Sequence, residues 1–504
     1  MILLPQWTEK AEKRGLDPLG MQNSGVLLYQ SLLPGISNVT LRMRYYGYYC
    51  WVSETYARRG TTSDFQAWRI WVRRAEALYA LVSARTGETG VGGIEWANRR
   101  LATTGRVIDF EAAASTDPAQ ERYLRQSLGV FGGAYYSQMA EMNLFTENRH
   151  GIQVATKDLG RRAASLFADA IGPDLARLLR QKIVDAKVSL RELDRLQPIA
   201  PSQIKEESEE RSFYETLLFA RSGDAGKTGP SRAASLDLIL ETAFMQEEWP
   251  SPEQVRWHLF DPPEPALPSS LESQRLAWEA YQCQDMMQVA CAALLAWGIA
   301  IINAEAQGKS LVEIRAEVVA HLETLDDPDP DSSWRALRLG LDPRTFDYAE
   351  MWDELTGARG AVADKAVSAC LLIAALHQRL LDRPDLAAAA AQGLPDRGMA
   401  HSLRTEISWL EGREGERTAT LIADYMIERI IRRHSHVAMQ KLRRQGDYTF
   451  LFEQQEGRFV YLAAYQPVAT TPRLASAIQF LADIHLLDDD GLTSLGLAAR
   501  DAGR

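Results

Sequence analysis

Apolar side chains recur every three or four residues along most of this chain, which is the period of an amphipathic helix. The stretch after Ser63 shows the pattern clearly, because Phe65, Trp68 and Val72 fall on one helical face. Ser63 followed by Gln66 is a capping-box pattern that predicts where this helix starts. The same period predicts further helices at about 119–143, 156–187, 206–220, 233–246, 271–304, 310–324, 361–382 and 403–445. The expected fold class is therefore mainly α.

A period of two appears near the C-terminus. Tyr448, Phe450 and Phe452 alternate with other residues, a Gln-Gln-Glu-Gly turn follows, and the chain returns over 458–462. This pattern predicts a β-hairpin.

Proline-rich segments at 196–203, 261–270 and 326–333 separate the helical blocks, so we expect a multi-domain helical protein. We predict three consecutive domains. Residues 1–175 form a basic, aromatic-rich helical domain, 176–402 a central acidic helical domain, and 403–504 a region with a long helix and the hairpin.

Small winged-helix-like modules are expected to close the first and the last of these regions. The final GLTSLGLAAR resembles the way many winged helices end, with a threonine capping a last helix that contains a glycine. The segment VATKDLGRRAASLF, which starts at Val154, has a similar cadence with one extra residue between its threonine and its glycine.

The apolar run Met286–Ile302 is short for a membrane span and contains Gln288, so it predicts a buried core helix. The N-terminus becomes charged within ten residues and does not read as a secretion signal. Four scattered cysteines without a CxxC pair suggest neither a zinc ribbon nor a disulfide framework. We therefore expect a cytoplasmic protein that does not contact a membrane.

Charge is distributed unevenly along the chain. The net charge is −11, yet residues 1–110 carry 14 Lys and Arg against 9 Asp and Glu, a net of +5. A basic front on an acidic body is expected if one end meets an anionic partner.

The first candidate binding segment, 33–51, reads LPGISNVTLRMRYYGYYCW. Arg42, Arg44, Tyr45 and Tyr48 combine cations with rings, as single-strand binding does when bases stack and arginines hold phosphates. Rings at this helical spacing are also typical of a core, so both interpretations stay open.

The second candidate segment is the basic stretch 428–446, which carries a net charge of +5. Basic side chains on a helix beside a hairpin suit phosphate contact without base readout. The alternative is the solvated face of an amphipathic helix. The candidate residues are Arg429, Arg432, Arg433, Lys441, Arg443 and Arg444.

Other motifs fail on spacing. Gly226–Thr228 resembles a phosphate loop, but Arg221 stands where that loop needs a glycine. Asp327–Asp331 lacks the glycine and the bidentate glutamate of a calcium loop. His434 and His436, two apart on a helix, point to different faces. No catalytic residue, metal ligand or cofactor is assigned.

Two stretches carry a resemblance to a known group. LDPLGMQNSGVLLYQSLLPGISNVTLRMRYYGYYCWV near the N-terminus and KLRRQGDYTFLFEQQEGRFVYL near the C-terminus resemble a family of large, uncharacterised bacterial proteins associated with anti-phage defence islands. The resemblance implies a cellular context and other defence-system proteins as partners, but no catalytic residues.

The leading hypothesis is a non-enzymatic component of a bacterial defence system that binds DNA or RNA, or assembles with proteins, through its basic ends. One alternative is an enzyme, a nuclease or nucleotide-processing effector, with a site assembled from distant residues. A second is a structural scaffold for basic partners. In that case the basic ends should pack against the protein's own carboxylates.

Overall fold

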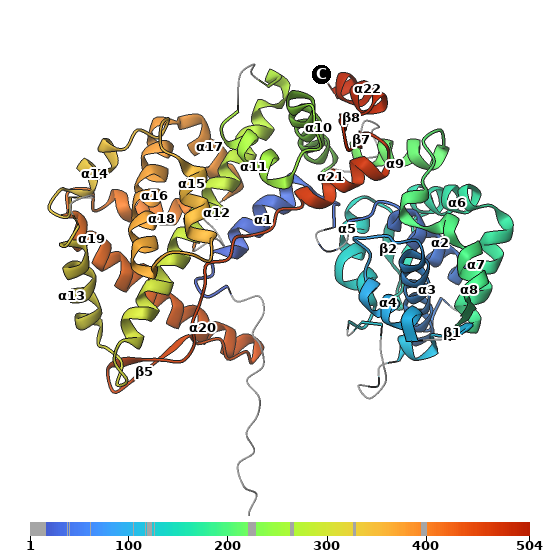
Figure 1. Ribbon diagram of the computed structural model, residues 1–504, viewed down its shortest axis with the longest axis horizontal. Helices are drawn as coiled ribbons and strands as arrows, with labels where there is room; N and C mark the ends of the chain where they lie inside the picture. Colours follow the sequence, from blue (N-terminus) through green and yellow to red (C-terminus); the bar gives the residue numbers. More distant parts are fainter. Residues whose placement is uncertain are drawn as a thin grey trace, which may run out of the picture. The chain divides into compact units, whose positions relative to one another are not determined.

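The computed structural model describes residues 17–503, except 38, 40, 61, 104, 116, 118–122, 125, 220–227, 263–266, 326–328 and 395–400. Within these described residues helices dominate, and the strands form four antiparallel pairs (Figure 1). The prediction of a mainly α protein with a C-terminal hairpin is confirmed. The phosphate-loop-like Gly226–Lys227 and the first aspartate of the calcium-like run, Asp327, lie outside the described residues.

The chain forms two compact units that are not consecutive in sequence. Unit 1 combines the described residues up to Leu28 with Leu276–Thr470, and unit 2 combines Tyr29–Arg275 with Thr471–Arg504. This division differs from the predicted three consecutive domains. The reason is that the last segment packs with residues more than two hundred positions earlier, for example through Asp483 and Arg42.

Unit 1 is built around one long helix, α12 (Glu272–Asn303), whose first residues belong to unit 2. The elements that follow are α13 (Leu311–Leu322), α14 (Trp334–Gly340), α15 (Tyr348–Thr356), α16 (Val362–Asp382), α17 (Pro384–Gly393), α18 (Leu403–Glu411), α19 (Thr418–Tyr425), the π-helical η6 (Met426–Ile431), α20 (Arg432–Gln445), β5 (Phe452–Gln455) and β6 (Arg458–Tyr461). Helix α1 (Gln22–Leu32) starts in unit 1.

Helix α12 is mostly buried, with polar as well as apolar side chains inside the protein. Its Gln284 side chain accepts from the Leu403 amide of α18 at 2.7 Å, and Trp297 packs edge-on against His321 of α13. By length and composition this helix is a candidate membrane span, yet 89% of its most apolar stretch is buried inside the protein. The predicted core helix is therefore observed.

Unit 2 contains the remaining elements. Its helices are α2 (Tyr45–Ala57), α3 (Phe65–Arg85), α4 (Ile94–Thr103), η1 (Glu111–Ala114), η2 (Phe131–Tyr135), α5 (Tyr136–Glu141), α6 (Leu159–Ile171), α7 (Pro173–Asp185), α8 (Leu190–Arg195), η3 (Gln197–Ile199), η4 (Pro201–Gln203), α9 (Glu209–Phe219), α10 (Gly229–Gln246), α11 (Pro252–Phe260), η5 (Ser269–Leu271), α21 (Leu474–Asp483) and α22 (Ser494–Gly503). Its strand pairs are β1 (Val107–Asp109) with β4 (Lys187–Ser189), β2 (Phe145–Glu147) with β3 (Gln153–Ala155), and β7 (Leu487–Asp488) with β8 (Gly491–Leu492).

Several predicted helix limits change. The predicted helix 156–187 is two helices, because Gly172 has a φ of 84° and Pro173 starts a new helix. The predicted helix 403–445 is interrupted between α18 and α19. Asp64, not Ser63, caps α3, with its carboxylate accepting from the amides of residues 66 and 67.

The two segments with a similar cadence share a local structure within unit 2. Each runs helix, strand pair, helix, as α5–β2–β3–α6 and α21–β7–β8–α22. A left-handed residue follows the first helix of each, Asn143 with φ 59° and His485 with φ 62°. Thr156 donates to the Asn143 carbonyl at 2.7 Å, and Thr493 donates to the His485 carbonyl at 2.6 Å.

The glycines of these two modules are fixed by close backbone approach. A Cβ on Gly160 would lie 2.3 Å from the carbonyl oxygen of Leu144, and one on Gly496 would lie 2.1 Å from that of Leu486. In both modules the second helix therefore passes directly against the preceding segment, and only glycine fits at the point of contact. This explains why a glycine follows the threonine at a similar spacing in both segments.

A buried carboxylate joins two elements of unit 2. Glu76 of α3 accepts from the amides of Phe131 at 2.6 Å and Val130 at 3.2 Å and from the Tyr49 hydroxyl at 2.8 Å. It thus caps the helical run that starts at Gly129. Burial raises the pKa of Glu76 to about 7, above its usual range.

We predict that Glu76 makes the stability of unit 2 depend on pH. A carboxyl whose folded-state pKa exceeds its unfolded value of about 4.3 favours folding fully at low pH, and this contribution is lost as the pH rises through about 7. The free energy of unfolding should fall by roughly 4 kcal/mol between about pH 4.3 and pH 7. Urea unfolding at a series of pH values, comparing Glu76→Gln with the wild type, measures it.

The control is Glu111→Gln, because that side chain is 70% exposed. It should keep the wild-type pH profile. A Glu76→Gln protein with an unchanged profile between pH 4 and 8 would contradict the assignment.

Candidate functional site

The structure places both arginines of the first candidate segment inside unit 2. Arg42 pairs with Asp483 at 3.1 Å and with Glu88. Arg44 pairs with Glu210 at 3.0 Å and donates to the Ala200 carbonyl at 2.9 Å. Their charges are used internally, so they are not positioned to hold phosphates.

The tyrosines of this segment are equally enclosed. Tyr45 and Tyr48 are 1% and 0% exposed, and the rings of both pack against Tyr79 of α3. The Tyr48 hydroxyl donates to the Ala75 carbonyl at 2.7 Å. No base can stack on these rings. The core interpretation of their helical spacing is the correct one, and the stacking role for Tyr45 and Tyr48 is withdrawn.

In the second candidate segment, two of the six cations converge on one buried carboxylate. Glu406 of α18 accepts from Arg429 at 2.7 and 3.1 Å and from Arg433 at 2.6 Å. The Tyr425 hydroxyl donates to the same carboxylate at 2.7 Å. These charges and hydrogen bonds outweigh burial and hold the pKa of Glu406 below its usual value.

The π-helical segment η6 explains how one carboxylate reaches three side chains. Tyr425, Arg429 and Arg433 are spaced by four, and in an α-helix such positions drift by roughly 40° each. A π turn holds more residues, and this offsets the drift. All three therefore face Glu406.

Lys441 and His434 hold α20 to the rest of unit 1. The Lys441 ammonium donates to the Asp17 carbonyl at 2.7 Å. The Leu451 amide donates to His434 Nε2 at 3.0 Å, so His434 Nδ1 carries the proton that faces the Pro18 carbonyl. Burial lowers the pKa of His434 to about 4. His434 is therefore structural, whereas His436 faces solvent.

Three candidate cations remain at the surface. Arg432, Arg443 and Arg444 are exposed, and none forms an ion pair with another described residue. Helix α20 contains no acidic residue that would neutralise them. These three arginines are what the structure retains of the predicted anion-contact set.

Most of the exposed polar residues of α20 lie on one side of the helix, together with the exposed Met439. Arg432, His436, Gln440 and Arg443 follow each other at intervals of four, four and three, so they lie along one side of the helix over about 17 Å. We call these four and Arg444 the α20 basic face. The sequence analysis did not place His436 and Gln440 beside the arginines. Their spacing of four and eight residues from Arg432 already indicates that they share one side of a helix.

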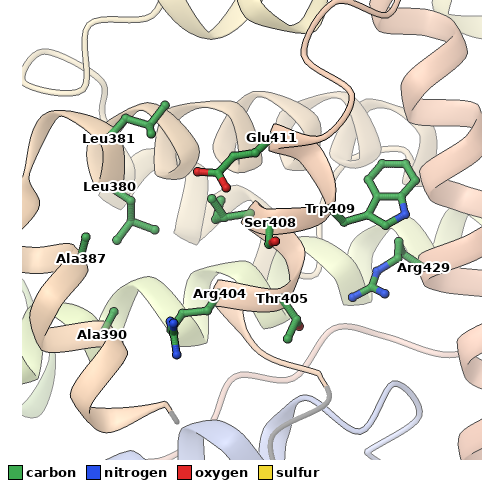
Figure 2. A pocket seen from close by; sticks show the side chains of 11 residues that line it. Leu380, Leu381, Ala387, Ala390, Arg404, Thr405, Ser408, Trp409, Glu411 and Arg429 are labelled. Carbon is green, nitrogen blue, oxygen red and sulfur yellow. The ribbon is translucent and has the colours of Figure 1, made fainter. Parts of the chain in front are cut away.

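A cavity of about 790 Å³ lies elsewhere on unit 1, between α16, α17 and α18 (Figure 2). Its polar lining comes from Arg404, Thr405, Ser408 and Glu411 of α18 and from Arg429. Its apolar lining includes Leu380 and Ala387, on the opposite side in the close-up. No pattern in the sequence indicates this cavity, because α18 reads as an ordinary amphipathic helix.

Among the residues that the structure describes, no group of three or more His, Cys, Asp and Glu is placed to hold a metal ion. The four cysteines are buried and form no disulfide. Burial raises the pKa of the Cys283, Cys291 and Cys370 thiols to about 12.

No protein-family model, curated protein or solved structure matches this chain.

We predict that Glu406→Gln destabilises unit 1 by roughly 3 kcal/mol at pH 7, because it leaves two arginines around a neutral group. A carboxyl with a lowered folded-state pKa stabilises the fold above its unfolded value of about 4.3, and this contribution is lost as the pH falls further. The difference between variant and wild type should therefore shrink in acid. Urea unfolding at pH 7 and near pH 3 measures both effects.

The matched control is Glu350→Gln on the surface of α15. Its unfolding free energy should stay within about 0.5 kcal/mol of the wild type. Equal stability of Glu406→Gln and Glu350→Gln at pH 7 would refute a structural role for the cluster.

Proposed function

We propose that this chain is a binding protein that contacts the phosphate backbone of DNA or RNA through the α20 basic face. The observation that carries the proposal is the contrast within one segment. Arg429 and Arg433 share a carboxylate, whereas Arg432, Arg443 and Arg444 face solvent without an ion pair among the described residues.

The geometry suits contact with a charged polymer. The face extends about 17 Å, and a duplex of that length carries roughly ten phosphate charges. Guanidinium groups bind phosphate oxygens through paired N–H donors, and Gln440 adds a neutral donor to the same side. Such contacts position a nucleic acid without reading its sequence.

The cellular context of the proposal comes from the resemblance to proteins of anti-phage defence islands. In that setting the chain is a cytoplasmic, non-enzymatic component that acts with other defence-system proteins. This cavity gives the enzyme alternative little support, because its lining contains one carboxylate, Glu411, and no histidine to pair with it.

A structural scaffold for basic partners is the second candidate, and a specific observation favours it. Arg42, Arg44, Arg429 and Arg433 do pack against the protein's own carboxylates. The acidic turn Asp488–Asp490 is exposed on unit 2 and suits a basic partner.

We predict salt-dependent binding of nucleic acid that requires the exposed arginines. Fluorescence anisotropy with single-stranded and duplex DNA and RNA should show affinity falling steeply with salt, with a logarithmic slope near −3 if three phosphates are neutralised. The variant Arg432→Ala/Arg443→Ala/Arg444→Ala should lose at least about tenfold in affinity and most of that slope. Arg433 is left intact because it is structural.

A control of equal charge is available on the same unit. Arg335, Arg344 and Arg359 are exposed, and none forms an ion pair with another described residue. The variant Arg335→Ala/Arg344→Ala/Arg359→Ala should bind like the wild type. Equal losses of affinity in both triple variants would show that net charge alone, and not the α20 basic face, causes the binding. Absence of binding at low salt would favour the scaffold.

A further inference from the structure

A second cavity lies in unit 2, where the end of α2 and the end of α7 meet helix α3. Its volume is about 340 Å³, within the range of about 300–1,000 Å³ that small-molecule pockets occupy. Such pockets are lined mainly by apolar and aromatic side chains, and a few polar groups fix the orientation of the ligand. Neither the α20 basic face nor the cavity beside α18 shares a residue with this one.

Two aromatic rings form the inner wall of the cavity. Tyr56 and Trp71 line it and are almost fully buried. Their polar atoms already have partners, because the Tyr56 hydroxyl donates to the Asp64 carbonyl at 3.0 Å and the Trp71 indole N–H donates to the Val52 carbonyl at 3.0 Å. The rings therefore offer only carbon surface to a ligand.

The aliphatic part of the lining reaches the solvent. Ile70 of α3 is 38% exposed and Val184 of α7 is 44% exposed, whereas Ile183 is buried. Ala67 lies one helical turn before Trp71 on the same side of α3, and its single methyl group leaves the space open. A compact apolar group bound here removes the exposed surface of Ile70 and Val184 from water.

Arg59 brings a positive charge to this apolar cavity. It lines the cavity, and its guanidinium lies 4.9 Å from the centre of the Trp71 ring. The side chain is exposed and forms neither an ion pair nor a hydrogen bond with another described residue. A ring face attracts the cation without using its N–H groups as a carboxylate does, so these donors remain for a ligand.

Arg74, the other cation in the lining, is already compensated. Its Nη2 pairs with Glu111 at 3.2 Å, and its Nη1 donates to the Val184 carbonyl at 3.1 Å, which holds the end of α7 against α3. None of the described residues that line the cavity is acidic. The charge left for a ligand is therefore that of Arg59, and a group with a single negative charge matches it.

We propose that this cavity binds a small apolar carboxylate, with its carboxylate paired to Arg59 and its apolar body between the aromatic rings and the aliphatic side chains of α3 and α7. A carboxylate accepts two parallel N–H bonds from one guanidinium and carries one charge. A phosphate monoester carries about 1.5 to 2 negative charges at pH 7, more than one arginine neutralises.

Isothermal titration of the full chain with phenylacetate tests the proposal, beside the neutral phenylacetamide and the more highly charged phenyl phosphate. Phenylacetate should give a saturable isotherm, and phenylacetamide should bind at least about tenfold more weakly because it lacks the charge. Tighter binding of phenyl phosphate than of phenylacetate would overturn the assignment to a carboxylate. Heats that do not saturate with phenylacetate would overturn the site.

A matched pair of substitutions tests the role of Arg59. Arg59→Gln should weaken phenylacetate binding by at least about tenfold and leave the affinity for phenylacetamide unchanged. Arg58→Gln is the control, because Arg58 is the exposed neighbouring residue, carries the same charge and does not line the cavity. It should bind phenylacetate within about threefold of the wild type. Equal affinities of the two variants for phenylacetate would refute pairing with Arg59.

Ala67→Leu tests the apolar part of the site separately. Leucine fills the space beside Trp71, so phenylacetate and phenylacetamide should both lose at least about tenfold in affinity. Ala67 is half-buried on α3 and leucine favours helices, so the variant should unfold at the wild-type temperature. Unchanged affinity for phenylacetate in this variant would place the ligand elsewhere.

Discussion

The architecture depends on one constraint, which is that a guanidinium group removed from water must be neutralised or fully hydrogen-bonded. Arg42 meets it with Asp483, which lies 441 positions later in the sequence, and with Glu88. Asp483 also accepts a hydrogen bond from the Met43 amide at 2.8 Å. It therefore holds the chain just before α2 in place and also neutralises the charge of Arg42. This cluster, Arg42 with Glu88 and Asp483, explains why residues after Thr471 belong to unit 2.

Backbone carbonyls satisfy the same constraint elsewhere in unit 2. Arg232 is 1% exposed and donates to the carbonyls of Leu217 and Leu218, which end α9, and to that of Pro34. Last-turn carbonyls of a helix lack partners within the helix, so a buried cation there caps it. Burial lowers the pKa of Arg232 to about 10. Arg73 is held in the same way by the carbonyls of Ala113 and Leu124.

The local sequence pattern predicts the helices and strands of this fold well, but it does not predict which of them contact each other. The long α12 helix and the β5–β6 hairpin follow from runs of apolar or alternating residues, which act within a short window. The break at Gly172 was visible as a Gly-Pro pair, but the apolar period continued across it. Two units interleaved in sequence could not be inferred, because their cause is pairing over hundreds of positions.

The candidate site shows the same division. Composition identified the basic stretch 428–446, but composition does not distinguish Arg432 from Arg433, and only the second meets a carboxylate. That assignment depends on Glu406 and on the π turn, neither of which has a reliable sequence signature. For Arg42 and Tyr48 the same mixture of cations and rings proved to be core, since α2 is enclosed on all sides.

The position of Asp483 has a consequence for synthesis on the ribosome. Domains commonly fold as their residues emerge, from the N-terminus onward. Here Asp483, which pairs with Arg42, and Arg500, which pairs with Glu241 at 3.0 Å, are made only after all of Leu276–Thr470. Unit 2 therefore cannot complete its core until the whole segment Leu276–Thr470 of unit 1 has been synthesised. A chain arrested before Asp483 would leave Arg42 with Glu88 as its remaining carboxylate and unit 2 with an incomplete core, which makes it a ready substrate for chaperones and proteases.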